Sequence, residues 1–506
     1  MSVKYLVMSD LHLGAKESLL THADEEGNIL PDPSPTLAAF GKAMRATFEA
    51  MEIDEGGVQL VLLGDVLDLG LSPFGKVSHS FLQFLDVLQP EGAAKVFAPD
   101  IVYIPGNHDH HMWRMTQDQQ FVTELERSGH ANAGDPKQRM DDDDSIHRDI
   151  LHTTRLTAYP DLPCRMLCAL MQRHAYFREG RSRIAYPNWA IVSDDGNRAV
   201  AMHHGHYIDS MYRSLSNLRG WLTGDKMRPD TMLELEQQNG PWIDFLWSDL
   251  GSAGLIGAGA DTLYETLLDA GASHAFAQTM ARRITDALRA KTGIQPTTEL
   301  KFGVTVKEMV QAAVDLTAGR GAEQQRDGYR SVMTPSEVDD LRWYIGTPLA
   351  NQFAASPTGI VPDGLSFIFG HTHKPFQDQL AIDRYAHPVS VFNTGGWVLD
   401  QPTLMPAQGT AAILIDDDLN VTSLRLLNDV INDTLVPIHA AQAGGRGPRG
   451  AILQAAAAKA VAATAPAWAE FSDAARARIE KLAEERVSHF MDEEDARSVD
   501  ALEALS

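Results

Sequence analysis

Cysteine and long apolar runs are scarce in this sequence of 506 residues. Cys164 and Cys168 are the only cysteines, which excludes a disulfide framework and a four-cysteine zinc site. Their spacing puts them on one helical face, so we expect ordinary packing in a reducing compartment. No run approaches the roughly 18 consecutive apolar residues of a membrane span, and residues 1–4 lead into the first apolar run without a signal core. These features predict a cytoplasmic protein with no transmembrane segment.

Basic residues are also few. Lys and Arg number 43 against 68 Asp and Glu, which gives a formal net charge of −25. Nonspecific binding of nucleic acid requires a basic surface that releases counterions. The composition therefore counts against nucleic acid as a partner, although it leaves a local basic groove open.

Five apolar, strand-like runs are each followed by residues that can bind a metal ion. The run at 58–63 has the branched composition of a buried strand. The residues after the five runs are Asp10 and His12; Asp65 and Asp68; Asn107, His108 and Asp109; His203, His204 and His206; and His371 and His373. A single Gly-Asp pair after a strand is more often a turn. However, open α/β sheets bind ligands at this edge, and oxygen and imidazole ligands suit Mn, Fe or Zn. The pairs spaced i, i+2 would lie on one side of an extended segment, so the five together predict a metal centre.

Alternating strand-like and helix-like runs predict a layered α/β domain that the chain builds in two parts. We expect the first part of this core at residues 1–208 and the second at 361–430. Between them, 209–360 is predicted to be an all-helical insertion, either a lid or an extension that packs on the core or forms an oligomer contact. Residues 431–506 are Ala-rich and predicted to be helical, a tail that packs on the core or joins a homo-oligomer. The helices predicted within the insertion lie at 235–250, 261–270, 275–290, 306–316 and 335–344.

In this order, the motifs resemble those of the calcineurin-like metallophosphoesterases: Asp-x-His, Gly-Asp-x-x-Asp, Gly-Asn-His-Asp/Glu, a His often followed by Gly, and Gly-His-x-His. The resemblance covers about residues 1–207 and 365–426. It implies an α/β fold in which a layered β-sandwich is flanked by helices. It also implies two divalent metal ions, one held by Asp10, His12, Asp65 and His373, the other by Asp65, Asn107, His204 and His371. Asp68 would steady a ligand by a hydrogen bond, and His206 would be a substrate contact; His110 and His111 lie outside the pattern.

Two cations about 3.5–4 Å apart can clamp both oxygens of an in-line displacement at phosphorus and hold a hydroxide at neutral pH. A bridging carboxylate, here Asp65, would set that separation. His108 is not in the implied ligand set and is expected to assist departure of the leaving oxygen, with Asp109 orienting its imidazole; the alternative is a buried structural histidine. We therefore expect a hydrolase acting on a small-molecule phosphate ester, foremost a phosphodiester.

Three alternatives stay open at this point. The enzyme could be a phosphomonoesterase or a pyrophosphohydrolase. It could be an exonuclease-like DNA phosphodiesterase, which the acidic composition disfavours. A noncatalytic binding scaffold is the third alternative, since a fold does not determine function, but the complete set of motifs argues against it.

Overall fold

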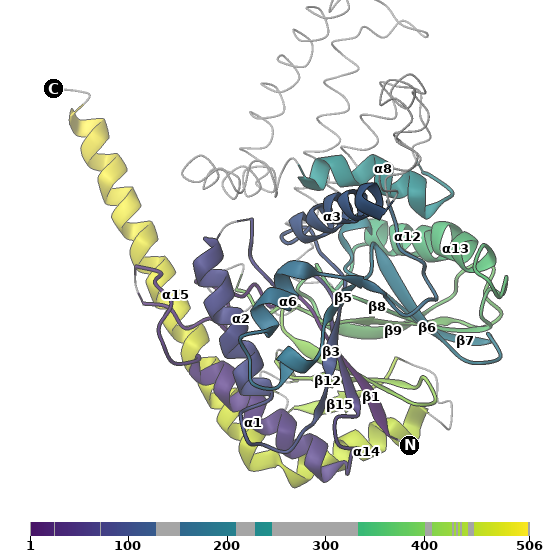
Figure 1. Ribbon diagram of the computed structural model, residues 1–506. Coiled ribbons are helices and arrows are strands. Elements are labelled where there is room, and N and C mark those ends of the chain that lie inside the picture. Colours follow the sequence, from purple (N-terminus) through teal and green to yellow (C-terminus); the bar gives the residue numbers. More distant parts are fainter. Residues whose placement is uncertain are drawn as a thin grey trace, which may run out of the picture.

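The computed structural model describes residues 2–24, 26–70, 72–127, 152–208, 228–244, 332–399, 407–427, 430–431, 434–435, 438–443 and 450–503. Two β-sheets form its centre (Figure 1). The larger sheet has the strand order β15 (His439–Ala441), β12 (Val421–Arg425), β11 (Ala411–Asp416), β1 (Val3–Met8), β2 (Val58–Leu62), β3 (Phe97–Tyr103), β5 (Ser182–Ile184) and β4 (Leu162–Pro163). The smaller sheet has the order β6 (Asn188–Val192), β7 (Arg198–His203), β8 (Gly364–Phe369), β10 (Val389–Asn393) and β9 (Phe376–Leu380). A short separate pair joins β13 (Val430–Ile431) to β14 (Thr434–Leu435).

Helices cover both outer faces of the paired sheets. Those whose side chains join the core of the larger sheet are α1 (Pro35–Ala50), α2 (Phe74–Leu88), α6 (Arg165–Met171), α14 (Gly450–Ala463) and α15 (Ala465–Glu503). Those packed on the smaller sheet are α8 (Met232–Ile243), α12 (Pro335–Tyr344) and α13 (Ala350–Ala354), with the short π-helix η4 (Ile345–Leu349). Side chains of α3 (His111–Arg127) and η1 (Phe177–Glu179) also join the core of the larger sheet, and those of η2 (His206–Ile208) join the core of the smaller one. The fold is thus the predicted α/β sandwich flanked by helices.

Alternating side chains explain why these runs form strands buried on both faces. Met8 of β1 belongs to the core beneath the helices, whereas its neighbour Val7 lies between the sheets. On the other sheet, Phe367 of β8 faces the outer helices and Ile368 faces inward. Because successive side chains of a strand point to opposite faces, a nearly continuous apolar run is what such a strand requires.

Parallel pairing brings the predicted motifs to one edge. Strands β1, β2 and β3 run parallel in one sheet, and β7, β8 and β10 run parallel in the other. Backbone hydrogen bonds then join the loops after the strands, including Asp10 N to Gly64 O at 2.9 Å and Gly370 N to His204 O at 2.7 Å. The five loops therefore meet, and the fold itself assembles the site.

The described part of the predicted insertion is helical. Helix α12 has the predicted bounds, and α8 begins three residues before the predicted start. The helices expected at 261–270, 275–290 and 306–316 lie outside the described residues, so the division into domains stays a prediction. Six of the described strands were not predicted: β4, β5, β9, β13, β14 and β15.

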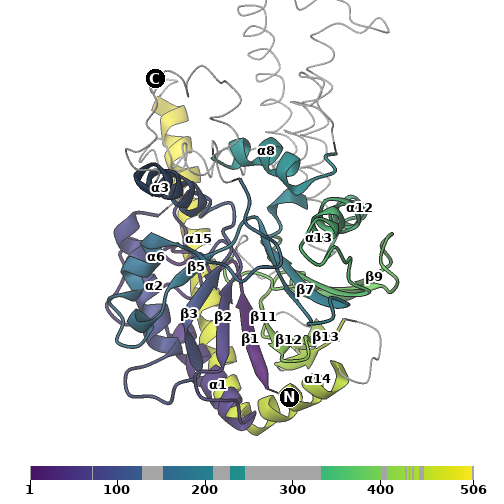
Figure 2. The ribbon, with the colours of Figure 1, turned by 45° about the vertical axis from the view of Figure 1, so that its right-hand side comes forward.

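The C-terminal helix α15 packs along α1 (Figures 1 and 2). The Phe471 ring lies 6.0 Å from that of Phe40 and 6.2 Å from that of Trp397. Trp468 Nε1 donates to Thr47 Oγ1 at 3.0 Å. The start of this helix is therefore part of the core of the larger sheet. Among the described helices, none is long and apolar enough to cross a bilayer.

Candidate metal centre

The predicted ligands gather at the edge where the parallel strands end. Three groups of side chains each bring their ligand atoms within 4.8 Å of one another: Asp10, His12 and His373; His12, Asp65 and His108; Asp65, His204 and His371. Asp65 and His12 each belong to two of these groups. Asn107 joins the last group, because its Oδ1 lies 3.1 Å from His204 Nε2.

The Asp65 carboxylate lies between the two halves of this cluster. Its Oδ2 is 3.1 Å from His204 Nε2 and 4.0 Å from His12 Nε2, and its Oδ1 accepts from the His108 amide at 2.8 Å. His204 Nδ1 donates to the Leu63 carbonyl at 3.0 Å. That bond leaves Nε2 as the nitrogen that faces the carboxylate, which is the orientation a metal-binding imidazole requires.

The electrostatics of the buried cluster favour a cation. Burial alone would raise the pKa of Asp65, but the neighbouring His204 and His108 outweigh it and hold this pKa well below its usual value. Burial alone would lower the pKa of His204, but Asp65 and Asp10 outweigh it and raise this pKa to about 9. His12 Nε2 is buried without a hydrogen-bond partner. A divalent ion would both neutralise the carboxylates and satisfy this nitrogen, so the side chains present fit a metal.

Backbone conformation is unusual at these residues. Among the described residues, eight that are not glycine have positive φ, and five of them are predicted ligands with φ between 44° and 68°: Asp10, His12, Asp65, His371 and His373. Left-handed backbone costs a residue with a Cβ roughly 1–2 kcal/mol, and such strain concentrates at functional sites. The prediction that the i, i+2 pairs lie in extended segments was therefore wrong, because both members of each pair have a left-handed backbone.

The backbone of Gly106 packs directly against the cluster and leaves no room for a side chain. A Cβ at this position would overlap the Asp65 carboxylate and lie 2.8 Å from His204 Nε2. Only a residue without a side chain lets the β3 loop approach this closely.

The comparison with known families agrees with this geometry. A model of the family described as calcineurin-like phosphoesterase matches residues 3–284, more than half of the chain. The chain belongs to this family. No curated protein matches it. Family membership and the His and Asp groups together support metal-dependent hydrolysis of a phosphoester.

The match ends before the last motif of this calcineurin-like phosphoesterase. His371 and His373 are joined to the cluster by the structure, since the His371 amide donates to Asp10 Oδ1 at 3.0 Å and His373 Nε2 lies 3.4 Å from that oxygen. Asn393, at the end of β10, was not predicted to have a role. It holds the same loop, because its Nδ2 donates to Gly370 O at 2.9 Å and to Thr372 Oγ1 at 3.1 Å.

Asp68, and not the expected Asp109, contacts the His108 imidazole. Asp68 Oδ1 lies 3.0 Å from His108 Nδ1 and 3.8 Å from His12 Nδ1. Burial alone would raise the Asp68 pKa, but these imidazoles hold it well below its usual value. The carboxylate that contacts His108 is thus Asp68, which also steadies His12.

The Asp109 carboxylate lies under the turn that carries Asp65. Its Oδ1 accepts from the amides of Gly106 at 2.6 Å and Asp65 at 3.3 Å, and its Oδ2 from those of Val66 at 2.9 Å and Leu67 at 3.4 Å. Although Asp109 is next to His108 in sequence, its contacts fix the backbone of the β2 loop.

His206, which was expected to contact a substrate, lies beneath the surface of the protein. Its side chain is fully buried, and its ring lies 4.2 Å from that of Tyr207. His203 is buried at the end of β7, with its ring 5.0 Å from that of Tyr344. Both histidines pack behind the cluster.

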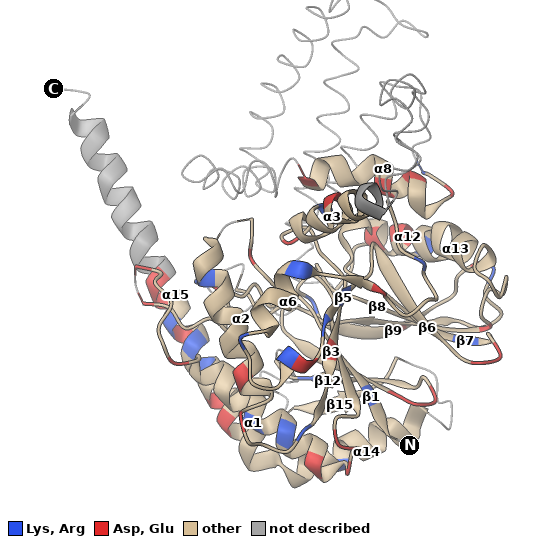
Figure 3. Ribbon diagram, viewed as in Figure 1, with Lys and Arg blue, Asp and Glu red and all other residues tan. Residues whose placement is uncertain are grey.

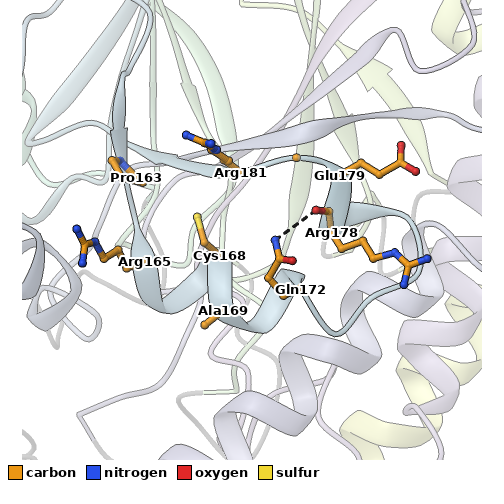
Figure 4. A pocket seen from close by; sticks show the side chains of 9 residues that line it. Pro163, Arg165, Cys168, Ala169, Gln172, Arg178, Glu179 and Arg181 are labelled. Atoms are coloured by element: carbon orange, nitrogen blue, oxygen red, sulfur yellow. Dashed lines mark hydrogen bonds between the residues drawn. The ribbon is translucent and has the colours of Figure 1, made fainter.

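A hollow of about 560 Å³ lies over α6 and the loop before β5 (Figure 4). Because β5 runs parallel to β3, this loop is at the opposite end of the sheet from the β3 loop that holds Asn107. The guanidinium groups of Arg165 and Arg178 point to opposite sides of the hollow (Figure 4). They do not converge on one point as the donors of a phosphoryl site would, so the metal cluster is the better candidate.

Proposed function

We propose that the protein hydrolyses a phosphodiester with two divalent metal ions, Mn, Fe or Zn, held at the strand ends. One would be bound by Asp10, His12, Asp65 and His373, and the other by Asp65, Asn107, His204 and His371. When bound, the ions would activate water as the nucleophile and neutralise charge on the phosphoryl group.

The observation that carries the proposal is the position of Asp65. Its buried, ionised carboxylate faces His204 at 3.1 Å and His12 at 4.0 Å. It belongs to two groups of potential ligands, one of which contains His12 and the other His204. A carboxylate shared in this way is suited to bridging two ions, and its removal should affect both.

His108 is the proposed general acid. The side chain of His108 is 13% exposed, whereas that of Asp68 is 2% exposed. His108 can therefore contact a bound substrate, and Asp68 cannot. The ionised Asp68 accepts a hydrogen bond from His108 Nδ1 at 3.0 Å and so fixes the imidazole. The imidazole is then oriented to give a proton to the leaving oxygen, a contribution of about 10²–10⁴ in rate.

The nuclease alternative has less support. In Figure 3, Lys and Arg are interspersed with Asp and Glu along α1 and along the part of α15 whose side chains the structure describes. This pattern provides no continuous basic track on these helices for a phosphate backbone. A small-molecule ester is the proposed substrate class.

Hydrolysis of paired chromogenic mono- and diesters tests the proposal, with metal-free protein reconstituted separately with Mn²⁺, Fe²⁺ or Zn²⁺. We expect diester turnover that disappears in Asp65→Asn together with metal binding. His108→Ala should retain both ions and lose about 10²-fold or more in turnover. Turnover of monoesters alone would replace the phosphodiesterase with a phosphatase, and normal turnover in His108→Ala would remove the proposed acid.

A further inference from the structure

A network of buried, hydrogen-bonded polar side chains lies behind the metal cluster. His110 Nδ1 is 2.6 Å from Asp244 Oδ1, and His110 Nε2 is 2.7 Å from Tyr186 Oη. Tyr186 Oη lies 3.0 Å from Tyr207 Oη, which in turn is hydrogen-bonded to the Glu236 carboxyl group. All of these residues are at most 6% exposed except Asp244, whose side chain is 18% exposed. Such a continuous path of polar contacts through a protein interior is worth more than its separate pairs.

This network joins segments that are far apart in the sequence. His110 follows Asn107 by three residues, and Tyr207 follows His204 by three. Glu236 belongs to α8, and Asp244 directly follows that helix. Helices α3 and α8 lie side by side in both views of the ribbon (Figures 1 and 2). The network therefore ties both loops to one helix.

The network has enough hydrogen atoms to make each of its contacts a hydrogen bond. The four contacts need four hydrogens, of which the two tyrosines and a neutral His110 supply three. The fourth comes from a protonated Glu236, which then donates to Tyr207 Oη. Burial raises the pKa of Glu236, which is consistent with this arrangement. A fully satisfied buried network fixes one geometry, whereas a partly satisfied one would be costly.

We propose that this network positions Asn107 and His204, and so sets the affinity of one metal position while leaving the other unaffected. The inference rests on the proposed function, which assigns these two residues to the same ion. Asn107 Oδ1 and His204 Nε2 lie 3.1 Å apart, so a small shift of either loop would change their common geometry. The ion assigned to Asp10, His12, Asp65 and His373 depends on loops that none of the four contacts reaches.

Tyr186→Phe is the sharpest variant. It removes the hydroxyl at the centre of the network and keeps the ring, which stacks on Trp113 at 4.8 Å between centroids. Tyr176→Phe is the matched control, because Tyr176 Oη donates to Phe97 O at 2.6 Å at the far end of β3. Both variants lose one hydroxyl, but only the first belongs to the network.

Calorimetric titration of the metal-free full-length protein with Mn²⁺ tests the inference. We expect two ions in the wild type and in Tyr176→Phe. In Tyr186→Phe one ion should bind about 10–100-fold more weakly and the other unchanged, the range typical of partners that orient metal ligands. Both ions binding normally in Tyr186→Phe, or both weakened equally, would overturn the positioning role. A wild type that does not bind two ions would instead contradict the proposed function.

A second pair of variants keeps the test independent of the tyrosine. Glu236→Gln can still accept from or donate to Tyr207, whereas Glu236→Ala cannot. We expect Glu236→Ala to weaken the same single ion and Glu236→Gln to bind both almost as the wild type does. Equal titrations of the two variants would contradict a positioning role for the carboxyl group.

Discussion

Asp109→Asn tests whether this carboxylate builds the turn that carries Asp65 or orients His108. Each oxygen of Asp109 accepts from two backbone amides, one at 2.6 or 2.9 Å and one at 3.3 or 3.4 Å. An amide nitrogen in place of either oxygen leaves two buried N–H groups without an acceptor. Each buried donor without an acceptor costs about 1–3 kcal/mol, and the longer hydrogen bond of each pair contributes least. We therefore expect the free energy of unfolding to fall by about 2–4 kcal/mol.

Urea denaturation of the metal-free protein measures this loss, with Asp68→Asn as the control. Asparagine at 68 can still present an oxygen to His108 Nδ1 and leaves no backbone amide without an acceptor, so we expect a smaller loss of stability than in Asp109→Asn, together with a fall in turnover. Metal affinity should fall with stability in Asp109→Asn, because the same turn positions Asp65. Unchanged stability and metal affinity with turnover lost would refute this reasoning and restore Asp109 as the residue that orients His108.

Three further outcomes are expected. Gly106→Ala should weaken Mn²⁺ binding at least about 10-fold, since its Cβ would overlap the Asp65 carboxylate. A Mn²⁺ affinity equal to that of the wild type would show that the β3 loop is not constrained at this position. Phe471→Ala should destabilise the protein by about 3–5 kcal/mol in urea denaturation, because the ring is fully buried; a change below about 1 kcal/mol would mean that α15 is not part of the core. The raised pKa of Glu236 means that the folded state holds a proton more tightly than the unfolded state, so this group costs stability as pH rises above its usual range. Stability measured from pH 4 to 8 should thus decline less steeply in Glu236→Gln than in the wild type, and parallel curves would contradict a shifted Glu236.

The gathering of the ligands could be predicted because it depends on strand order. Apolar runs followed by Asp65, Asn107 or His204 identify buried strands and their carboxyl ends, and parallel pairing then brings those ends together. The left-handed backbone at Asp10 and His12 could not be predicted in the same way. It is imposed by tertiary contacts such as the hydrogen bond from Asp10 N to Gly64 O, and neither residue type signals it reliably.

Hydrogen bonds between residues that lie far apart in the sequence could not be predicted, for a similar reason. Asp109 was expected to orient His108 because the two are adjacent, but the contact is made by Asp68, from another loop. His110 received no role from the sequence, since its partner Asp244 approaches only when α8 packs against the β3 loop. Local pattern thus identified the strand ends but not the long-range hydrogen bonds that support them.

Turnover during a Mn²⁺ titration of metal-free protein tests the central claim most directly. Diester hydrolysis should rise with added Mn²⁺ and reach its plateau when two ions are bound per chain, and Asp65→Asn should remain inactive throughout. A plateau at one ion per chain, or the same turnover in Asp65→Asn, would contradict a two-metal centre bridged by Asp65.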